Sequence, residues 1–389
     1  MPGWVMSNHI AMLAPRTREE IVGPEDEGST VIVSPTDVTG GFVPEGVVVP
    51  ALPHAARPST STTRNGSARI GFNQFTMRIL FSGETFPSAR AMIAERLPSD
   101  ELDVWRDRNV IPQMTGIDVL VPMMFRIDAV VMDALRPRLI QQVGSGLEGV
   151  DLAAARARQI PVAALPASGS NAESVAEHVL MLVLALLREL PLAQANVRAG
   201  VLGAPQGRML AGRTVCLWGL GATALSLSHR LRSMGVKLLG ITRDPSSPKV
   251  AAYGLDACYA PADRAACLAQ TDILVPCIRL NEATKGIVDA AAFEQLPKGA
   301  YFVNAARGPL VDYRALYDAL ESGRLAGAAL DVFWTEPVAS DDPILALPNV
   351  IATPHIAGVT DRSYGEIVDG FTANIERFRR GEPLLNRSA

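Results

Sequence analysis

Residues 214–241 read TVCLWGLGATALSLSHRLRSMGVKLLGI, and this stretch decides the fold. An apolar run leads into a glycine-rich turn, an amphipathic segment follows, and a second apolar run closes the stretch. The pattern Gly219-x-Gly221-x-x-Ala224 lies at the turn. In a strand–turn–helix–strand context this pattern is typical of a dinucleotide-binding unit.

Each residue of the turn has a physical reason to be small. Gly219 permits the tight turn, and Gly221 has no Cβ, so a pyrophosphate can approach the backbone at the helix N-terminus. Ala224 keeps the helix close to the strand. The alternative interpretation is an empty strand–turn–helix junction.

Apolar runs alternate with helical stretches on both sides of this unit, which predicts parallel sheets covered by helices. Six candidate strands form the second series, as expected of a doubly wound dinucleotide fold: 214–219, 237–241, 272–278, 300–305, 326–333 and 349–354. The first series begins at Met77 with the runs MRILFSG, DVLVP, LIQQVGSG and IPVAALP.

The chain divides into three parts. Residues 1–76 hold scattered prolines and few sustained apolar periods, so we expect a disordered leader; one hypothesis is that Met77 is the natural start. We assign 77–175 and 361–389 to the domain of the first sheet, with the last helix returning to pack on it. We assign 176–360 to the dinucleotide-binding domain.

A long apolar helix is expected between the two series. Ser170 and Glu173 fit a capping box, and the helix is predicted to run to Leu190, before Pro191. It is apolar nearly all round, so it should be buried between domains or in a dimer interface. His178 is interpreted as a packed helical residue.

Composition limits the possible partners. A net charge of −4 without a Lys/Arg run gives no electrostatic signal for nucleic acid. The apolar run 179–187 is shorter than the roughly 20 residues that span a bilayer. Four cysteines without a Cys-x-x-Cys pair, and no signal peptide, indicate a cytoplasmic protein. We expect no bound metal.

The segment KLLGITRDP (237–245) bears on the choice of cofactor. A carboxylate at the end of this strand would bind both ribose hydroxyls of NAD, but Thr242 and Arg243 stand there. Thr242 removes a repulsion of the 2′-phosphate and Arg243 offers a guanidinium to it, which favours NADP over NAD. Asp244 favours NAD if it points inward, and Arg243 is alternatively a solvent-facing arginine.

Three candidate catalytic residues each follow a strand of the second series: Arg307, Glu336 and His355. Ligands of open α/β sheets bind at this carboxyl edge. The set suits reduction of a 2-oxo acid: Arg307 would hold the carboxylate, and His355 would give a proton to the carbonyl oxygen. Glu336 would favour the protonated form of His355. Separately, each has a structural alternative: a surface ion pair, a strand end or a packed histidine.

The stretch from about Met77 onward resembles the D-isomer-specific 2-hydroxyacid dehydrogenases. The motifs that carry the resemblance are VGSGLEGVDL, NAESVAEH, GLGATA, VNAARGPLVD, ALDVFWTEP and TPHIAG. It implies an α/β protein with two doubly wound parallel-sheet domains, a flavodoxin-like substrate domain and a Rossmann NAD(P)-binding domain, with the active site in the cleft between them. It also implies a homodimer.

The resemblance assigns roles residue by residue. Arg307, Glu336 and His355 become the catalytic set. Ser145 and Gly146 would offer backbone N–H groups to the substrate carboxylate. The cofactor would contact Ala222 and Thr223 at the pyrophosphate, and Ala305, Ala306 and Asp331 near the nicotinamide.

The expected activity is hydride transfer between NAD(P)H and a small 2-oxo acid or D-2-hydroxy acid, of the hydroxypyruvate/glyoxylate reductase kind. The pair Thr242–Arg243 resembles the NADP-preferring reductases of the family. Glu336 stands where the related formate dehydrogenases carry Gln, so formate oxidation is not expected. The alternatives are a phosphoglycerate or other 2-hydroxyacid dehydrogenase, phosphite as substrate, or a non-catalytic NAD(P)-sensing binding protein.

Overall fold

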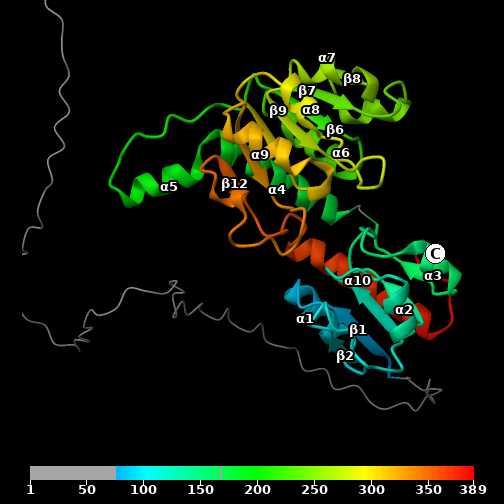
Figure 1. Ribbon diagram of the computed structural model, residues 1–389. Helices are drawn as coiled ribbons and strands as arrows, with labels where there is room; N and C mark the ends of the chain where they lie inside the picture. Colours follow the sequence, from blue (N-terminus) through cyan, green and yellow to red (C-terminus); the bar gives the residue numbers. More distant parts are fainter. Residues whose placement is uncertain (1–75, 167–168) are drawn as a thin grey trace, which may run out of the picture. The chain divides into compact units, whose positions relative to one another are not determined.

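The computed structural model describes residues 76–166 and 169–389, and Figure 1 shows two sheets flanked by helices. Within the described residues, neighbouring strands of both sheets pair in parallel, as expected where helices cover both faces. The prediction of two doubly wound α/β domains is confirmed. The leader expected over 1–76 lies outside the described residues, apart from its last residue.

The first sheet has five strands in the order β2-β1-β3-β4-β5, the flavodoxin-like order. The strands are β1 (Arg78–Ser82), β2 (Glu101–Val104), β3 (Val119–Pro122), β4 (Leu139–Gln141) and β5 (Val162–Ala163). The helices between them are α1 (Pro87–Arg96), α2 (Ala129–Leu135) and α3 (Leu152–Ala157). Strand β2 was not predicted, because this edge strand is only partly buried and its residues ELDV form no apolar run.

The C-terminal helix α10 (Asp361–Arg379) returns to the first sheet and contacts α1. Phe371 stacks on Phe81 of β1, with ring centroids 6.5 Å apart. The buried Asn374 side-chain amide donates to Gln141 Oε1 at 2.9 Å. The last helix is therefore anchored by both apolar packing and a satisfied buried polar pair.

The second sheet has seven strands in the order β12-β11-β10-β9-β6-β7-β8, the classic dinucleotide-binding order with one strand added. The strands are β6 (Thr214–Trp218), β7 (Lys237–Ile241), β8 (Ala257–Tyr259), β9 (Ile273–Pro276), β10 (Ala300–Asn304), β11 (Leu325–Leu330) and β12 (Val350–Ala352). The short, half-buried β8 was not predicted. The strand order reverses between β6 and β9, which is where such folds bind ligands.

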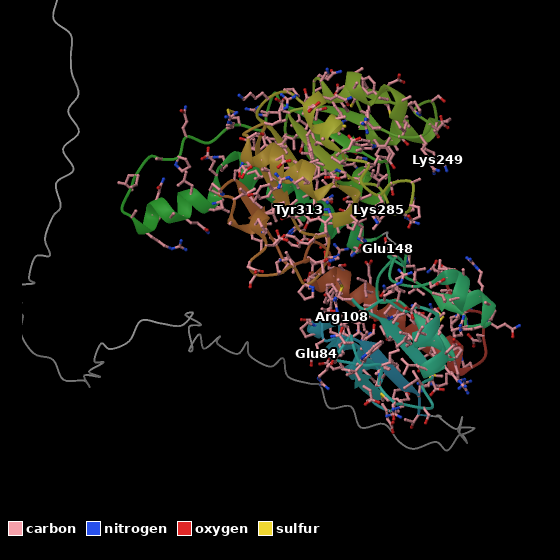
Figure 2. All side chains as sticks on the ribbon, in the orientation of Figure 1. Glu84, Arg108, Glu148, Lys249, Lys285 and Tyr313 are labelled. Atoms are coloured by element: carbon pink, nitrogen blue, oxygen red, sulfur yellow. The ribbon has the colours of Figure 1, made fainter. Side chains whose placement is uncertain are left out.

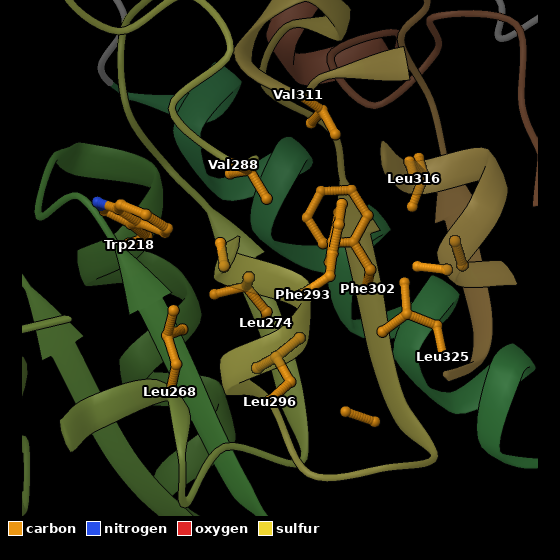
Figure 3. Packing of buried hydrophobic residues seen from close by; sticks show 14 of the residues in the cluster. Trp218, Leu268, Leu274, Val288, Phe293, Leu296, Phe302, Val311, Leu316 and Leu325 are labelled. Carbon is orange, nitrogen blue, oxygen red and sulfur yellow. The ribbon is translucent and has the colours of Figure 1, made fainter. Parts of the chain in front are cut away.

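Helices cover both faces of the second sheet. They are α4 (Ser170–Leu187), α6 (Ala222–Arg232), α7 (Arg264–Leu268), α8 (Ala290–Gln295) and α9 (Tyr313–Glu321), with the 3₁₀ turns η1 (Pro248–Tyr253), η2 (Pro261–Asp263), η3 (Gly308–Leu310) and η4 (Pro343–Ala346). Helix α5 (Leu190–Arg198) buries no residue and lies away from the sheet (Figure 1). On one face Phe293 of α8 packs edge-on against Phe302 of β10, with 5.5 Å between the ring centroids, in a buried cluster that also contains Leu274 and Trp218 (Figure 3). On the other face α4 and α6 pack against each other and cover the sheet.

The start and end of α4 differ from the prediction. The Ser170 side chain donates to Glu366 of α10 and does not cap the helix, so the capping-box interpretation is wrong. The helix ends at Leu187, and Pro191 lies in the first turn of α5, where proline is tolerated. In the described part of the chain α4 alone is long and apolar enough to cross a membrane, and 56% of it is buried within the protein. Buried core helices pass the same test.

Candidate active site

The glycine turn joins β6 to α6 at the point where the strand order reverses. Gly219 has a φ of +102°, and a Cβ there would lie 2.8 Å from the Cys277 carbonyl oxygen, so only glycine fits. A Cβ on Gly221 would meet nothing within 4 Å. Helix α6 begins next, with Ala222 and Thr223 in its first turn. The open space next to Gly221, in front of the N–H groups of the first turn of α6, can accommodate a pyrophosphate.

The end of β7 carries no carboxylate in line with the strand. Thr242 is half-buried and its N–H donates to the Tyr259 carbonyl at 3.0 Å. Arg243 is exposed and forms no ion pair with any residue that the structure describes. Asp244 is also exposed, and its Oδ1 accepts a hydrogen bond from the Ser246 hydroxyl at 2.7 Å. The next carboxylate along the sequence therefore accepts a hydrogen bond within its own loop.

Arg307, Glu336 and His355 follow the adjacent strands β10, β11 and β12 and line one pocket with a volume of about 370 Å³. The His355 Nδ1 lies 2.7 Å from Glu336 Oε2, and Glu336 Oε1 accepts the Phe333 N–H at 2.9 Å. Both carboxylate oxygens of Glu336 are thus engaged. The side chain of Glu336 is 14% exposed and that of His355 is 34% exposed, so the imidazole is the accessible member of the pair.

Asp331, directly after β11, holds the loop that carries the histidine. Its fully buried carboxylate accepts from Thr353 Oγ1 at 2.6 Å and from the N–H groups of Ile356 and Ala357, each at 2.9 Å. Burial raises the pKa of Asp331, but these donors and His178 outweigh it and bring the pKa below its ordinary value. His178 also lies 3.0 Å from Thr353 Oγ1, so it belongs to this buried network.

Glu148, which the sequence analysis did not single out, faces Arg307. Arg307 Nε lies 3.3 Å from Glu148 Oε1, and Arg307 Nη1 donates to the Ala306 carbonyl at 2.6 Å. A Cβ on Gly146 would clash with both the guanidinium and the Glu148 carboxylate. The motif VGSGLEGVDL has two charged side chains, Glu148 and Asp151, and Asp151 caps α3, so the second carboxylate was an available signal.

Several of the remaining predicted residues line the same pocket, but Ala306 does not; its N–H donates to the Asn304 side chain at 3.0 Å. Ser145, Gly146 and Ala305 line the pocket. Phe86, at the start of α1, approaches the His355 ring edge-on, with centroids 5.6 Å apart. Tyr364 of α10 also lines the pocket. Burial raises the pKa of its phenol to about 12, so the hydroxyl stays neutral.

Comparisons with known proteins agree with this geometry. Residues 180–357 match the model of the D-isomer specific 2-hydroxyacid dehydrogenase, NAD binding domain. A D-3-phosphoglycerate dehydrogenase of Archaeoglobus fulgidus is 29% identical over 314 residues, 76% of this chain and 58% of the relative, so the chain spans little more than half of that protein. A glyoxylate reductase of Korarchaeum cryptofilum is 30% identical over 299 residues, 72% of this chain and 87% of the relative.

A solved structure is similar over nearly all of its chain. The NADPH-dependent glyoxylate/hydroxypyruvate reductase of Sinorhizobium meliloti, in complex with NADP and malonate, is 30% identical with a TM-score of 0.69. The match covers 80% of this chain and 97% of that one. Our chain has the two-sheet fold, the glycine turn and the Arg, Glu and His at three adjacent strand ends; it belongs to the D-isomer-specific 2-hydroxyacid dehydrogenase family.

Proposed function

We propose that this protein is an NAD(P)-dependent reductase of small 2-oxo acids, of the glyoxylate/hydroxypyruvate kind, which also oxidises D-2-hydroxy acids. The observation that carries the proposal is that Arg307 and the hydrogen-bonded pair Glu336–His355 line one pocket. A cationic guanidinium and a supported proton donor are the two groups that reduction of a 2-oxo acid requires from a protein.

Arg307 would bind the substrate carboxylate, together with the backbone N–H groups of Ser145 and Gly146 on the facing loop. This orients the 2-carbonyl toward His355, whose Nδ1 is engaged by Glu336, so that Nε2 is the nitrogen that gives its proton to the carbonyl oxygen. The anionic Glu336 stabilises the imidazolium before the proton leaves. Bound NADPH or NADH supplies the hydride to the carbonyl carbon.

The residues of the dinucleotide-binding domain fit a cofactor along the carboxyl edge of the second sheet. Gly219, Gly221, Ala222 and Thr223 would lie against the pyrophosphate, and Ala305 and Ala306 near the nicotinamide. Asp331 would act there by holding the loop after β12, since its side chain is buried. Thr242 and the exposed Arg243 favour NADP, because no carboxylate opposes a 2′-phosphate and Asp244 is engaged by Ser246.

We further propose a division into a substrate domain, residues 77–175 and 361–389, and a cofactor domain, residues 176–360. The packing of α10 against α1 and β1 supports this division. The protein would act in the cytoplasm, and the four cysteines of the chain are free thiols.

A homodimer is proposed from the surface of α5 and the segment that follows it. Helix α5 has no buried residue. Large apolar side chains are exposed here, and Leu202 is 93% exposed: Leu190, Leu192, Val197, Val201, Leu202 and Met209. A run of exposed apolar groups of this extent indicates a protein partner, and the same surface of a second copy is the partner of matching chemistry.

The test is the loss of absorbance of reduced nicotinamide with glyoxylate or hydroxypyruvate, with NADPH and NADH supplied separately. We expect turnover with both acids and a higher kcat/KM with NADPH. His355→Ala should lower turnover by several orders of magnitude with little change in cofactor binding. If the protein binds NADPH but reduces no 2-oxo acid, the binding-protein alternative gains; oxidation of 3-phosphoglycerate alone would favour the phosphoglycerate dehydrogenase alternative.

A further inference from the structure

We propose that Glu148 is a built-in competitor of the substrate: its carboxylate pairs with Arg307 and is displaced when a 2-oxo acid binds. This inference rests on the proposed function, because it assigns Arg307 to the substrate carboxylate. It adds a residue that sets substrate affinity and that the proposed mechanism does not use.

The first observation is the ion pair itself. Arg307 Nε and Glu148 Oε1 are 3.3 Å apart, and both residues line the pocket that also holds Glu336 and His355. Arg307 comes from the loop after β10 and Glu148 from the loop after β4, so the pair joins the two sheets across the pocket. Glu148 is labelled in Figure 2.

The second observation is where the pair lies. A Cβ placed on Gly146 would clash with Arg307 Nη2 and with Glu148 Oε2, so both charged groups lie directly over this glycine. The Gly146 carbonyl accepts from the Gln142 side-chain amide at 2.8 Å, which holds the loop in place. The ion pair therefore covers the backbone to which the substrate carboxylate would bind.

The third observation is that both side chains of the pair are partly exposed. The side chains of Arg307 and Glu148 are 33% and 34% exposed, so water screens the attraction and each partner is readily rehydrated. A substrate carboxylate brings the same charge and geometry as Glu148 and adds hydrogen bonds from the loop. The substrate thus replaces an equivalent internal carboxylate, and part of its binding free energy is used to displace it.

Removing the competitor should tighten the binding of a carboxylate. The probe is oxamate, an unreactive analogue of a 2-oxo acid, titrated into the NADPH-loaded protein by calorimetry. For Glu148→Gln we expect oxamate to bind about two- to fivefold more tightly than to wild type, the range that a partly exposed ion pair supplies. In the kinetic assay KM for glyoxylate should fall by a similar factor, with kcat nearly unchanged.

Glu84→Gln is the matched control. Glu84 also lies on a loop of the first sheet and is 2.6 Å from an arginine, Arg106, so this variant removes the same charge from an ion pair that is more exposed. Its oxamate affinity should equal that of wild type. Glu148→Ala provides a second variant with the same expected direction, and thermal unfolding reports whether each variant is folded.

The proposal would be overturned if Glu148→Gln and Glu148→Ala bound oxamate no more tightly than wild type does. It would also be overturned if Glu84→Gln gained as much oxamate affinity as Glu148→Gln, because that would indicate a general charge effect. Failure of oxamate to bind even to Glu148→Gln would overturn it as well, because a freed Arg307 should hold a carboxylate. The proposed function fails differently, through absence of turnover of any 2-oxo acid by wild type, and the binding comparison is independent of turnover.

Discussion

Replacing Glu336 by Gln tests whether the carboxylate beside His355 supports proton transfer. Glu336→Gln keeps the size of the side chain and an oxygen for the Phe333 N–H. In one orientation of the new amide, its NH₂ group takes the place of the carboxylate oxygen that lies 2.7 Å from His355 Nδ1. In the other orientation, the amide oxygen faces His355 and the NH₂ group faces the Phe333 N–H. In either orientation the imidazolium loses its anionic partner.

The magnitude follows from the nature of this hydrogen bond. A hydrogen bond to a charged group contributes about 1.5–3 kcal/mol, and each 1.4 kcal/mol is a factor of about ten. The Glu336 side chain is only 14% exposed, so solvent compensates little for the loss. We therefore expect kcat/KM for glyoxylate to fall by about 10- to 150-fold.

The assay is steady-state reduction of glyoxylate with NADPH, together with a fluorescence titration of NADPH. Cofactor affinity should stay within a factor of about two, since Glu336 contacts the histidine and not the glycine turn. Glu294→Gln, on the exposed surface of α8, is the control and should behave as wild type. A value of kcat/KM for Glu336→Gln within twofold of wild type would refute the assigned role of the pair.

Three further outcomes are expected. Thr242→Asp should lower the ratio of kcat/KM with NADPH to that with NADH at least tenfold, because a carboxylate repels the 2′-phosphate; an unchanged ratio would mean that position 242 does not contact the ribose. Asp331→Asn should lower the free energy of unfolding by about 1–3 kcal/mol at pH 7, because its buried donors lose a charged acceptor. The pKa of Asp331 is lowered in the folded state, so its contribution to stability is complete above about pH 4 and is lost as the pH falls through the pKa of the folded state. The thermal unfolding of Asp331→Asn should therefore depend less on acid pH than that of wild type. Leu202→Asp should convert a dimer into a monomer in sedimentation velocity, and a monomeric wild type would contradict the proposed interface.

Most of the fold could be predicted because its signals are local. The alternation of apolar runs and helical stretches indicates parallel sheets, and the glycine turn marks the strand-to-helix junction at which a cofactor binds. Strands β2 and β8 were missed because partly buried edge strands show little hydrophobic pattern. The capping interpretation of Ser170 was wrong because Glu366, far along the chain, competes for its hydroxyl.

The candidate site divides in the same way. Sequence alone determined which residues follow the carboxyl ends of β10, β11 and β12, and the parallel arrangement of those strands requires Arg307, Glu336 and His355 to share one edge. It did not determine that Asp331 is a buried anchor, nor that Glu148 meets Arg307 above Gly146. Those contacts join loops from distant parts of the chain, and no local periodicity records which side chains meet there. Only the packing of the two sheets' loops around one pocket decides it, because ion pairs and buried hydrogen bonds depend on distance in space and not on spacing in sequence.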